Sequence, residues 1–340
     1  GEDAVPEGKT FQEHILTLDS DATDEVSPRA PFEDVPTGRG LPELLTERDT
    51  LTGNWFGLGE ALEEEGIWVG LGLTQIYQLQ LNSTKGLQTH RHAGRYTGRY
   101  DLEAEFDLDT LLGLSGASVY AWAEGGWSNG IDISSIGSWQ GVNSDAYLGD
   151  QAIQLSVLYY QQNMFNDRVR VRLGKLDSSA NCFYVRGHDI GANINAYTQD
   201  ENRQFLNGSF LYDLTIPYPW YGLGISAMAL PTDWLYVYGA IVDDDPSYRG
   251  DSNTFKTAFG GPAYFFTNVE TGILLDLPQP NGSGTLPGTY RFGMWHQNRP
   301  KDDIRGGDKR DDIGMYVSID QMLFKERDDA EDAQGLGVFA

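Results

Sequence analysis

The sequence has almost no cysteine and no long hydrophobic run. Cys182 is the only cysteine among 340 residues, which excludes an intrachain disulfide and a zinc site built on paired cysteines. No apolar stretch reaches the roughly 18 residues that a transmembrane helix requires, so a helical membrane span is excluded. A transmembrane β-barrel is not excluded, because its strands need only alternate between apolar and polar residues.

Positive charge is also scarce. The chain has 24 Lys and Arg against 50 Asp and Glu, and its formal net charge is −26. A general nucleic-acid-binding protein would need a basic face, so this balance argues against one. Glycine is abundant, with 41 residues, and aromatic residues make up 12% of the chain. This composition favours many strands and tight turns over a helical bundle.

Two regions differ in composition. Residues 1–50 hold 13 acidic and 4 basic residues and five of the fourteen prolines, without a hydrophobic period. We predict an acidic, mostly extended leader there and a folded region over residues 51–340. Gly1 is followed by acidic residues rather than by the basic and apolar parts of a signal peptide, so we expect a processed chain. Residues 51–66 predict a short helix, with Asn54 as N-cap and Gly66 at its end.

From Ile67 onward the hydrophobic period is two. Between Arg95 and Leu108, apolar residues and glycine alternate with charged residues and threonine over fourteen positions, far more than the roughly five or six residues of an ordinary strand. The sequence predicts about eleven antiparallel strands of this kind. Their expected ranges are 67–81, 95–108, 117–127, 151–162, 168–176, 221–230, 234–243, 263–276, 289–297, 313–324 and 333–340.

The connections between these segments alternate in length. Residues 163–167 and 231–233 are short turns, whereas 82–94, 128–150, 177–217, 244–262 and 298–312 are long, polar and rich in Gly, Asn and Asp. Short turns at one end and long loops at the other are typical of an outer-membrane barrel. Aromatic residues near the strand ends are typical of the girdles at lipid–water interfaces. They are Tyr96, Tyr100, Tyr159, Tyr160, Trp220, Tyr221, Trp234, Tyr236 and Tyr238.

The polar faces of the strands carry charges that would be costly to bury without partners. We therefore expect them to stay hydrated and to line a water-filled lumen, although the solvent face of a one-sided soluble sheet would show the same pattern. Trp68 and Trp122 share this face and could offer stacking surfaces or simply fill the wall. The charged candidates for the lumen are Arg95, Arg99, Glu103, Glu105, Arg168, Arg170 and Arg172.

Several motifs in order resemble the carbohydrate-selective outer-membrane porins of the OprB type, over about residues 51–340. The stretch from Leu51 to Ile67 is similar to the family's opening turn, helix and first strand, although Asn54 and Phe56 replace its commoner Asp and Gly. The other similar stretches are 173–177, 205–210, 217–225 and 314–324. The resemblance implies an all-β fold, an antiparallel sixteen-stranded transmembrane barrel with a short N-terminal helix. Since eleven strands cannot close such a barrel, we expect that its C-terminal part is missing from this chain.

The resemblance also implies a function. It indicates passive diffusion of mono- or oligosaccharides across the outer membrane of a Gram-negative bacterium, without catalysis, with segment 177–217 folding inward to narrow the pore. Arginine would supply paired donors to sugar hydroxyls and glutamate would supply acceptors. The expected partners are outer-membrane lipid and sugars; trimers are common among porins, but no residue pattern identifies a subunit interface. Two alternatives stay open: a general or anion-selective porin, which the three arginines would suit, and a soluble β-rich carbohydrate-binding protein.

Other chemistry is weakly supported. His90 and His92 could chelate a metal from one strand, but no third ligand lies nearby in the sequence. The acidic groups 243–245, 328–329 and 331–332 could hold Ca²⁺, but none has the spacing of an EF-hand loop, and solvated surface charge is favoured. Cys182 has no activating base in its vicinity, which favours an inert thiol. We therefore expect no catalytic residue, no metal site and no cofactor.

Overall fold

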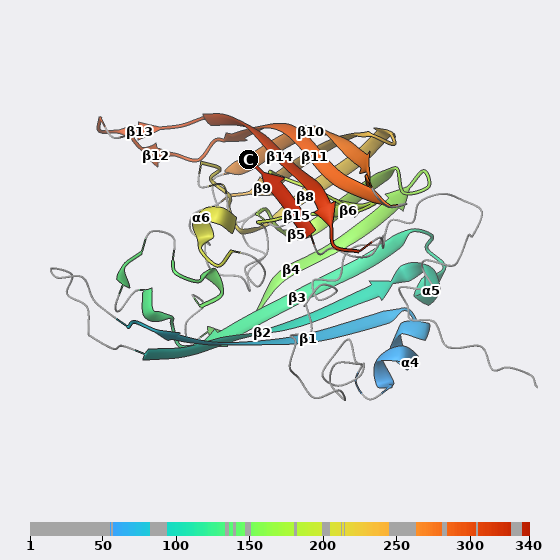
Figure 1. Cartoon of the computed structure of the whole chain (residues 1–340), viewed down its shortest axis with the longest axis horizontal. Helices are drawn as coiled ribbons and strands as arrows, with labels where there is room; N and C mark the ends of the chain where they lie inside the picture. The colour runs from blue at the N-terminus through green and yellow to red at the C-terminus, as the bar shows by residue number, and fades with distance from the viewer. Residues whose placement is uncertain are drawn as a thin grey trace, which may run out of the picture.

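A long, curved antiparallel sheet forms the body of the protein (Figure 1). The structure is a computed structural model. It describes Trp55 and residues 57–81, 94–132, 136–138, 141–146, 151–179, 182–198, 205–211, 213, 215–244, 263–280, 284–303, 305–327 and 335–340. The leader at residues 1–50 and the histidines at 90 and 92 lie outside the described residues.

The eleven strands of the sheet follow one another in chain order, and each pairs antiparallel with the next. In the first pair, for example, Ile67 lies opposite Phe106 and Leu79 opposite Gly94. The strands confirm all eleven segments expected from the period of two. They are β1 (Ile67–Leu79), β2 (Gly94–Asp107), β3 (Ala117–Trp127), β4 (Gln151–Met164), β5 (Val169–Asp177), β8 (Tyr221–Thr232), β9 (Leu235–Asp243), β10 (Phe265–Pro278), β11 (Thr285–Gln297), β14 (Asp312–Lys325) and β15 (Gly335–Phe339).

The other elements are short. They are the helices α4 (Leu58–Glu64), α5 (Leu108–Leu112), η2 (Ser144–Ala146) and α6 (Gly208–Leu211), the hairpin of β6 (Phe183–Val185) and β7 (His188–Ile190), and the hairpin of β12 (Lys301–Asp302) and β13 (Asp308–Lys309). Helix α4 begins after Gly57, which has a φ of 88° and offers no side-chain cap, so the helix starts later than an Asn54 cap predicts. Gly66 follows the end of the helix with a φ of 81°, as expected for a C-terminal glycine.

The outward face of the sheet is apolar along its whole width. Leu73 on β1 and Val317 on β14 are 61% and 70% exposed, although both lie within long regular strands. A soluble sheet would bury such residues, whereas a sheet in a bilayer turns them toward lipid. Other large side chains of this face are Leu71, Tyr77, Leu102, Leu173, Ile225, Val237, Ile241, Val269, Ile273, Phe292, Met294, Ile313 and Met315.

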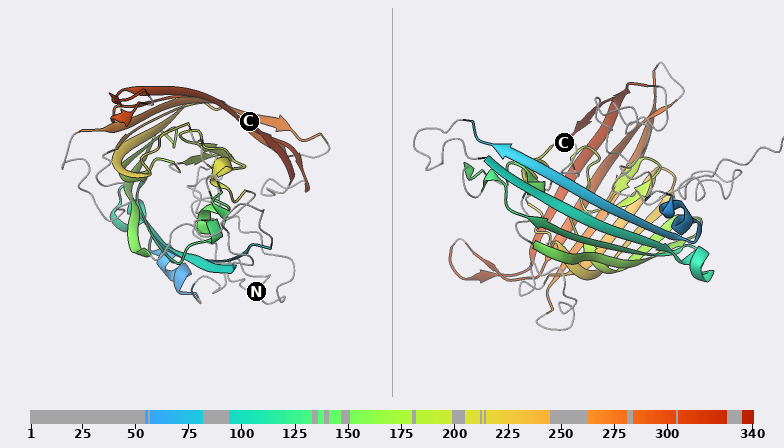
Figure 2. Two further views of the ribbon diagram at one scale, coloured as in Figure 1. Left: turned by 90° about the vertical axis from the view of Figure 1, so that its left-hand side faces the viewer. Right: turned by 90° about the horizontal axis from the view of Figure 1, so that it is seen from below.

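The sheet curves like the wall of a barrel but stays open between its edge strands β1 and β15 (Figure 2). At one end, short connections join β4 to β5 and β8 to β9, and at the other end the connections are long, as the sequence predicts. In the short turn after β4, Phe165, Asn166 and Asp167 all have positive φ angles between 53° and 60°. None of the helices in the described part of the chain has the length and hydrophobicity needed to cross a membrane.

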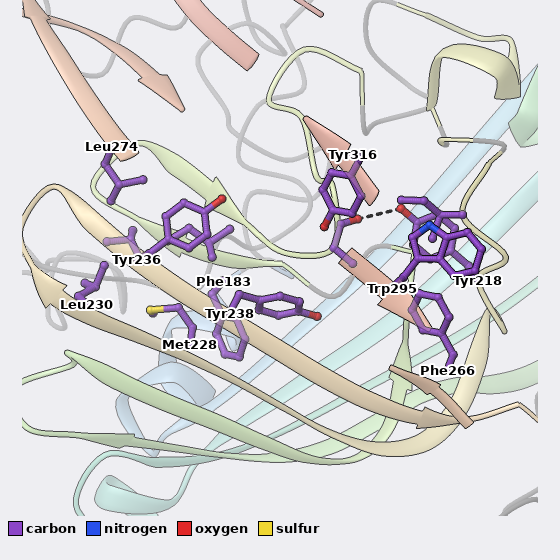
Figure 3. Close-up of a cluster of buried hydrophobic side chains, with 14 residues drawn as sticks. Phe183, Tyr218, Met228, Leu230, Tyr236, Tyr238, Phe266, Leu274, Trp295 and Tyr316 are labelled. Atoms are coloured by element: carbon purple, nitrogen blue, oxygen red, sulfur yellow. Dashed lines mark hydrogen bonds between the residues drawn. The ribbon is translucent and has the colours of Figure 1, made fainter. Parts of the chain in front are cut away.

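The concave side of the sheet holds a hydrophobic core of its own (Figure 3). Phe183 and Ile190 of the β6–β7 hairpin and Tyr218 pack against inward side chains of β8, β9, β10, β11 and β14. The ring centroids of Phe183 and Tyr238 lie 6.2 Å apart, and those of Tyr218 and Phe266 lie 5.9 Å apart. The segment after β5 therefore folds inward, where it covers the inner faces of β8 to β14.

This core corrects two expectations. Tyr236 and Tyr238 do not belong to an interfacial girdle, because both point inward and are fully buried. The inner face is also not uniformly hydrated, since aromatic residues from the wall and from the inward segment form a buried core against β8 to β14. Trp234 and Tyr96, in contrast, are about half exposed.

Candidate functional site

Arg99 on β2 is the centre of a charged cluster on the inner wall. Its Nε lies 2.9 Å from Asp101 Oδ1, its Nη1 lies 2.8 Å from Asp145 Oδ1, and its Nη2 lies 3.7 Å from Glu124 Oε2. The guanidinium also lies over the Trp122 ring, 5.4 Å from its centroid. Three carboxylates and one aromatic face therefore fix a single arginine in place.

Aromatic side chains continue this cluster across β3, β4 and β8. Tyr120 and Tyr159 are stacked with their centroids 5.3 Å apart, and Trp122 meets Tyr221 edge-on at 6.2 Å. Their polar atoms are directed at carboxylates. Tyr120 donates to Glu103, Tyr221 donates to Glu124 at 2.5 Å, and Trp122 donates from its Nε1 to Asp101 at 3.1 Å. We call this inner surface the aromatic–charged strip, and it consists of Arg99, Asp101, Glu103, Tyr120, Trp122, Glu124, Tyr159 and Tyr221.

The remaining candidates on β1 and β2 share the inner face with this strip. Trp68 pairs across the sheet with Glu105, which in turn lies opposite Tyr120. Arg95 lies opposite Gln78, toward the end of the sheet with the long connections, and is exposed. The structure thus brings together Arg95, Arg99, Glu103, Glu105, Trp68 and Trp122 on one continuous wall. Glu103 is only 2% exposed, so the expectation that it stays hydrated is wrong.

The three arginines near β5 do not form an open row. Arg168 lies at the rim, where its Nη2 pairs with Asp233 Oδ1 at 2.6 Å, and both side chains are largely exposed. Arg170 is completely buried and donates to the carbonyl of Tyr184 at 3.2 Å. The expectation that this row stays hydrated is therefore wrong for Arg170 and Arg172, because the inward hairpin covers them and offers backbone carbonyls in place of water.

Arg172 joins the wall to the hairpin. It donates to Gln161 Oε1 and to the carbonyl of Cys182, both at 2.8 Å. Its guanidinium lies 4.7 Å from the ring centroid of Tyr159 in the wall and 4.2 Å from that of Phe183 in the hairpin. A planar cation in contact with one ring of the wall and one ring of the hairpin fits a positioning role for the inward segment better than a role as a mobile ligand-binding group.

Buried polar residues tie the other side of the inward segment to β10, β11 and β14. Glu270 accepts hydrogen bonds from the backbone of Asn193 at 2.9 Å, from Tyr236 at 2.6 Å and from Tyr316 at 2.7 Å. Arg291 pairs with Asp320 and donates to the carbonyl of the hairpin residue Asp189. These contacts satisfy groups that would otherwise be costly to bury.

His188 anchors the tip of the hairpin in the same way. Its Nδ1 lies 3.1 Å from Thr289 Oγ1, and its Nε2 lies 3.3 Å from Asp276 Oδ1. The residue is buried, although nothing in the sequence around it distinguishes it from a loop histidine.

Cys182 and the two acidic residues at 243 and 244 are held in buried contacts, whereas residue 245 and the acidic groups 328–329 and 331–332 lie outside the described residues. The Cys182 thiol donates to Asp189 at 3.4 Å, and burial raises its pKa well above the usual thiol value, which disfavours the reactive thiolate. Asp243 and Asp244 are buried rather than solvated, and Asp244 contacts Arg299 and Gln297. Within the described ranges, no three His, Cys, Asp or Glu residues come together as a metal site would require.

Sequence reasoning missed several members of the site. Tyr120 and Glu124 share the parity of Trp122 on β3, so the period of two could have identified them. Asp145 follows no strand period, because it lies in the 3₁₀ helix η2 within a long connection. Its proximity to Arg99, 46 positions away in the chain, is decided only by the way this connection folds back.

Comparison with known proteins gives two kinds of match. The family model described as "Carbohydrate-selective porin, OprB family" matches residues 91–340. The high-pH structure of Pseudomonas putida OprB is 19% identical, with a TM-score of 0.66, and the similarity covers 85% of this chain and 69% of that chain. Its low-pH structure is 16% identical, with a TM-score of 0.45, over 85% of this chain and 70% of that chain. No curated protein sequence matches this chain.

Proposed function

Because this chain belongs to the OprB family of carbohydrate-selective porins, we propose that small carbohydrates diffuse passively through a water-filled pore whose wall is lined by charged and aromatic residues. Family membership makes it an outer-membrane protein of the Gram-negative type and a carbohydrate channel. This sets aside the alternative of a soluble carbohydrate-binding protein. The family and the fold point to a transport channel rather than to an enzyme.

The aromatic–charged strip is the observation that carries the proposal. A sugar ring has apolar faces, which can stack on Trp122 or Tyr120, and hydroxyl groups around its edge. Those hydroxyls can accept from the forked donors of Arg99, which stays partly exposed, while the buried carboxylates Asp101, Glu103 and Glu124 hold the arginine and the aromatic rings in place. Stacking surfaces beside paired donors and acceptors allow a sugar to exchange water for protein contacts while it stays able to leave.

The three arginines near β5 have a different role in this proposal. Arg170 and Arg172 are directed at backbone carbonyls of the inward hairpin, and Arg168 is paired with Asp233 at the rim. An anion-selective pore would present such a row to the lumen. Since these arginines are taken up by other contacts, we place the sugar pathway along the wall of β1 to β4. Its candidate lining consists of Arg95, Arg99, Glu103, Glu105, Trp68 and Trp122.

Outer-membrane lipid would surround the apolar outer face in this arrangement, with side chains such as Leu73 and Val317 in contact with acyl chains. A homotrimer and the part played by the acidic leader stay predictions.

The test is the single-channel conductance of the full-length protein in a planar bilayer, with and without added mono- and disaccharides. We expect discrete steps that sugars reduce in a concentration-dependent manner. Trp122→Ala should weaken this block by up to about tenfold, because one stacking contact contributes about 0.5–1.5 kcal/mol. Trp234→Ala is the matched control, since this tryptophan is exposed on a short turn outside the strip.

Each contrary result is informative. Steps that sugars do not change would leave a porin but remove the saccharide pathway. A sugar block of equal strength in the Trp122 and Trp234 variants would remove the aromatic–charged strip from the pathway. A strong anion preference under a salt gradient would favour the anion-selective alternative instead.

A further inference from the structure

A short inward loop connects the aromatic–charged strip to the inward segment. Residues 141–146, which include η2, lie inside the curve of the sheet, as does α6 (Figure 2). On the wall side, Asp145 Oδ1 pairs with Arg99 Nη1 at 2.8 Å, and the Asp145 side chain is 1% exposed. The loop is thus attached to β2 by a buried ion pair rather than by strand pairing.

The same loop is attached to the inward segment on its other side. The backbone amide of Ser144 donates to the carbonyl of Leu206 at 2.7 Å, and Asn207 donates to the carbonyl of Gly141. Next to Leu206, the ring of Phe205 stacks on Phe210 at 4.8 Å and meets Phe339 of β15 edge-on at 5.5 Å. Because β2 and β15 lie near opposite edges of the open sheet, these contacts reach from one side of the concave space to the other. We call this chain of contacts the strut.

We propose that the strut sets the width of the sugar pathway and that Asp145 is a size-determining residue for transport. The inference rests on the proposed function, because it concerns the same pathway. The strut meets the wall inside the aromatic–charged strip, so any movement of the loop changes the space in front of Trp122 and Arg99. A sugar that follows this wall must pass the strut.

Arg99 is the fixed end of the strut. Asp101, Glu124 and Trp122 hold its guanidinium whether or not Asp145 is present. Removing the Asp145 carboxylate therefore leaves Arg99 compensated, while the loop loses its ion pair with β2. The low dielectric around the buried pair strengthens the attraction between Asp145 and Arg99, so this contact contributes to holding the loop against β2.

The experiment compares Asp145→Ala, Asp145→Glu and wild-type full-length protein in planar bilayers. For Asp145→Ala we expect a conductance about twofold higher and passage of longer oligosaccharides, because a wider water-filled constriction offers less resistance. Asp145→Glu keeps the carboxylate and should stay near the wild-type conductance and size limit. Asp233→Ala is the matched control, since it removes an aspartate–arginine pair at the exposed rim.

A second measurement distinguishes a change in the width of the pathway from a general loss of stability of the barrel. The urea midpoint of each variant shows whether the barrel stays folded, and a purely structural role of Asp145 would lower this midpoint without moving the size limit. If Asp145→Ala does not fold, Arg99→Lys keeps the charge but loses the forked geometry, and it should shift the size limit in the same direction. Unchanged conductance and size limit in folded variants would overturn the inference. Loss of the sugar block in wild type would instead overturn the proposed function.

Discussion

Buried inward side chains are held by hydrogen bonds to other residues of the protein. Glu270 shows this most clearly, because it is 2% exposed and accepts from one backbone amide and two tyrosine hydroxyls. The alternation in the sequence places it on the inner face of β10. It does not reveal that the inward segment supplies Asn193 as one of its donors, since this contact joins residues 77 positions apart.

We expect Glu270→Gln to lower the free energy of unfolding by about 1–3 kcal/mol, because the amide replaces one acceptor oxygen with a donor and leaves a buried hydroxyl without a partner. Urea unfolding in detergent or lipid measures this change. The control is Asp308→Asn, a similar substitution on the exposed β13. Equal stability of the two variants would show that the three hydrogen bonds at Glu270 contribute little.

Among the elements, the β6–β7 hairpin depends on the wall for its position. It has only three residues in each strand, and a hairpin this short is unstable alone in water. Arg172 between Phe183 and Tyr159, together with the apolar core below it, supplies the missing stability. The sequence resemblance indicates that this segment folds inward, and the structure confirms it.

Cys182 reports on this attachment. In the wild type we expect slow reaction with a thiol reagent. Its rate should rise only well above the ordinary thiol pKa, because burial favours the neutral thiol and raises the pKa of Cys182. Arg172→Met removes the hydrogen bond to the Cys182 carbonyl, so labelling at a fixed pH should become at least about tenfold faster as hairpin opening becomes more frequent.

The control for this experiment is Arg168→Met, which removes a guanidinium from the rim without touching the hairpin carbonyls. Equal labelling rates in both variants would mean that the apolar core alone holds the hairpin in place.

The whole molecule has two separate apolar surfaces. One is the outward face, and the other is the core between the wall and the inward segment. A soluble protein needs only a buried core such as the one between the wall and the inward segment. The outward face requires lipid, which agrees with an outer-membrane protein.

Val317→Arg tests this arrangement. Val317 lies on the outward face of β14, opposite Phe292, and is 70% exposed. An arginine there should lower the free energy of unfolding in bilayers by about 2–4 kcal/mol if the position is near the midplane. Asp308→Arg on β13 is the control and should have little effect. A Val317 variant as stable as the control would contradict a lipid-facing position.

The sequence by itself determined the strands, their order and the face on which most side chains lie, with Tyr236 and Tyr238 as exceptions. The strands and their faces follow from a hydrophobic period of two and from the turn residues between strands, and both signals can be read within a few neighbouring positions of the chain. It therefore located Arg99, Glu103 and Trp122 on the inner face. The expectation of hydrated arginines at 170 and 172 failed for the same reason, because a strand pattern contains no information about what covers the strand.

Only the tertiary structure decided which inward residues line the pathway. The inward segment packs against the inner faces of β8 to β14, and the loop at 141–146 brings Asp145 to Arg99 in the aromatic–charged strip. These arrangements depend on contacts between residues far apart in the chain, made by irregular segments without a period. Their position is set by packing against the completed sheet, so it cannot be derived from local sequence.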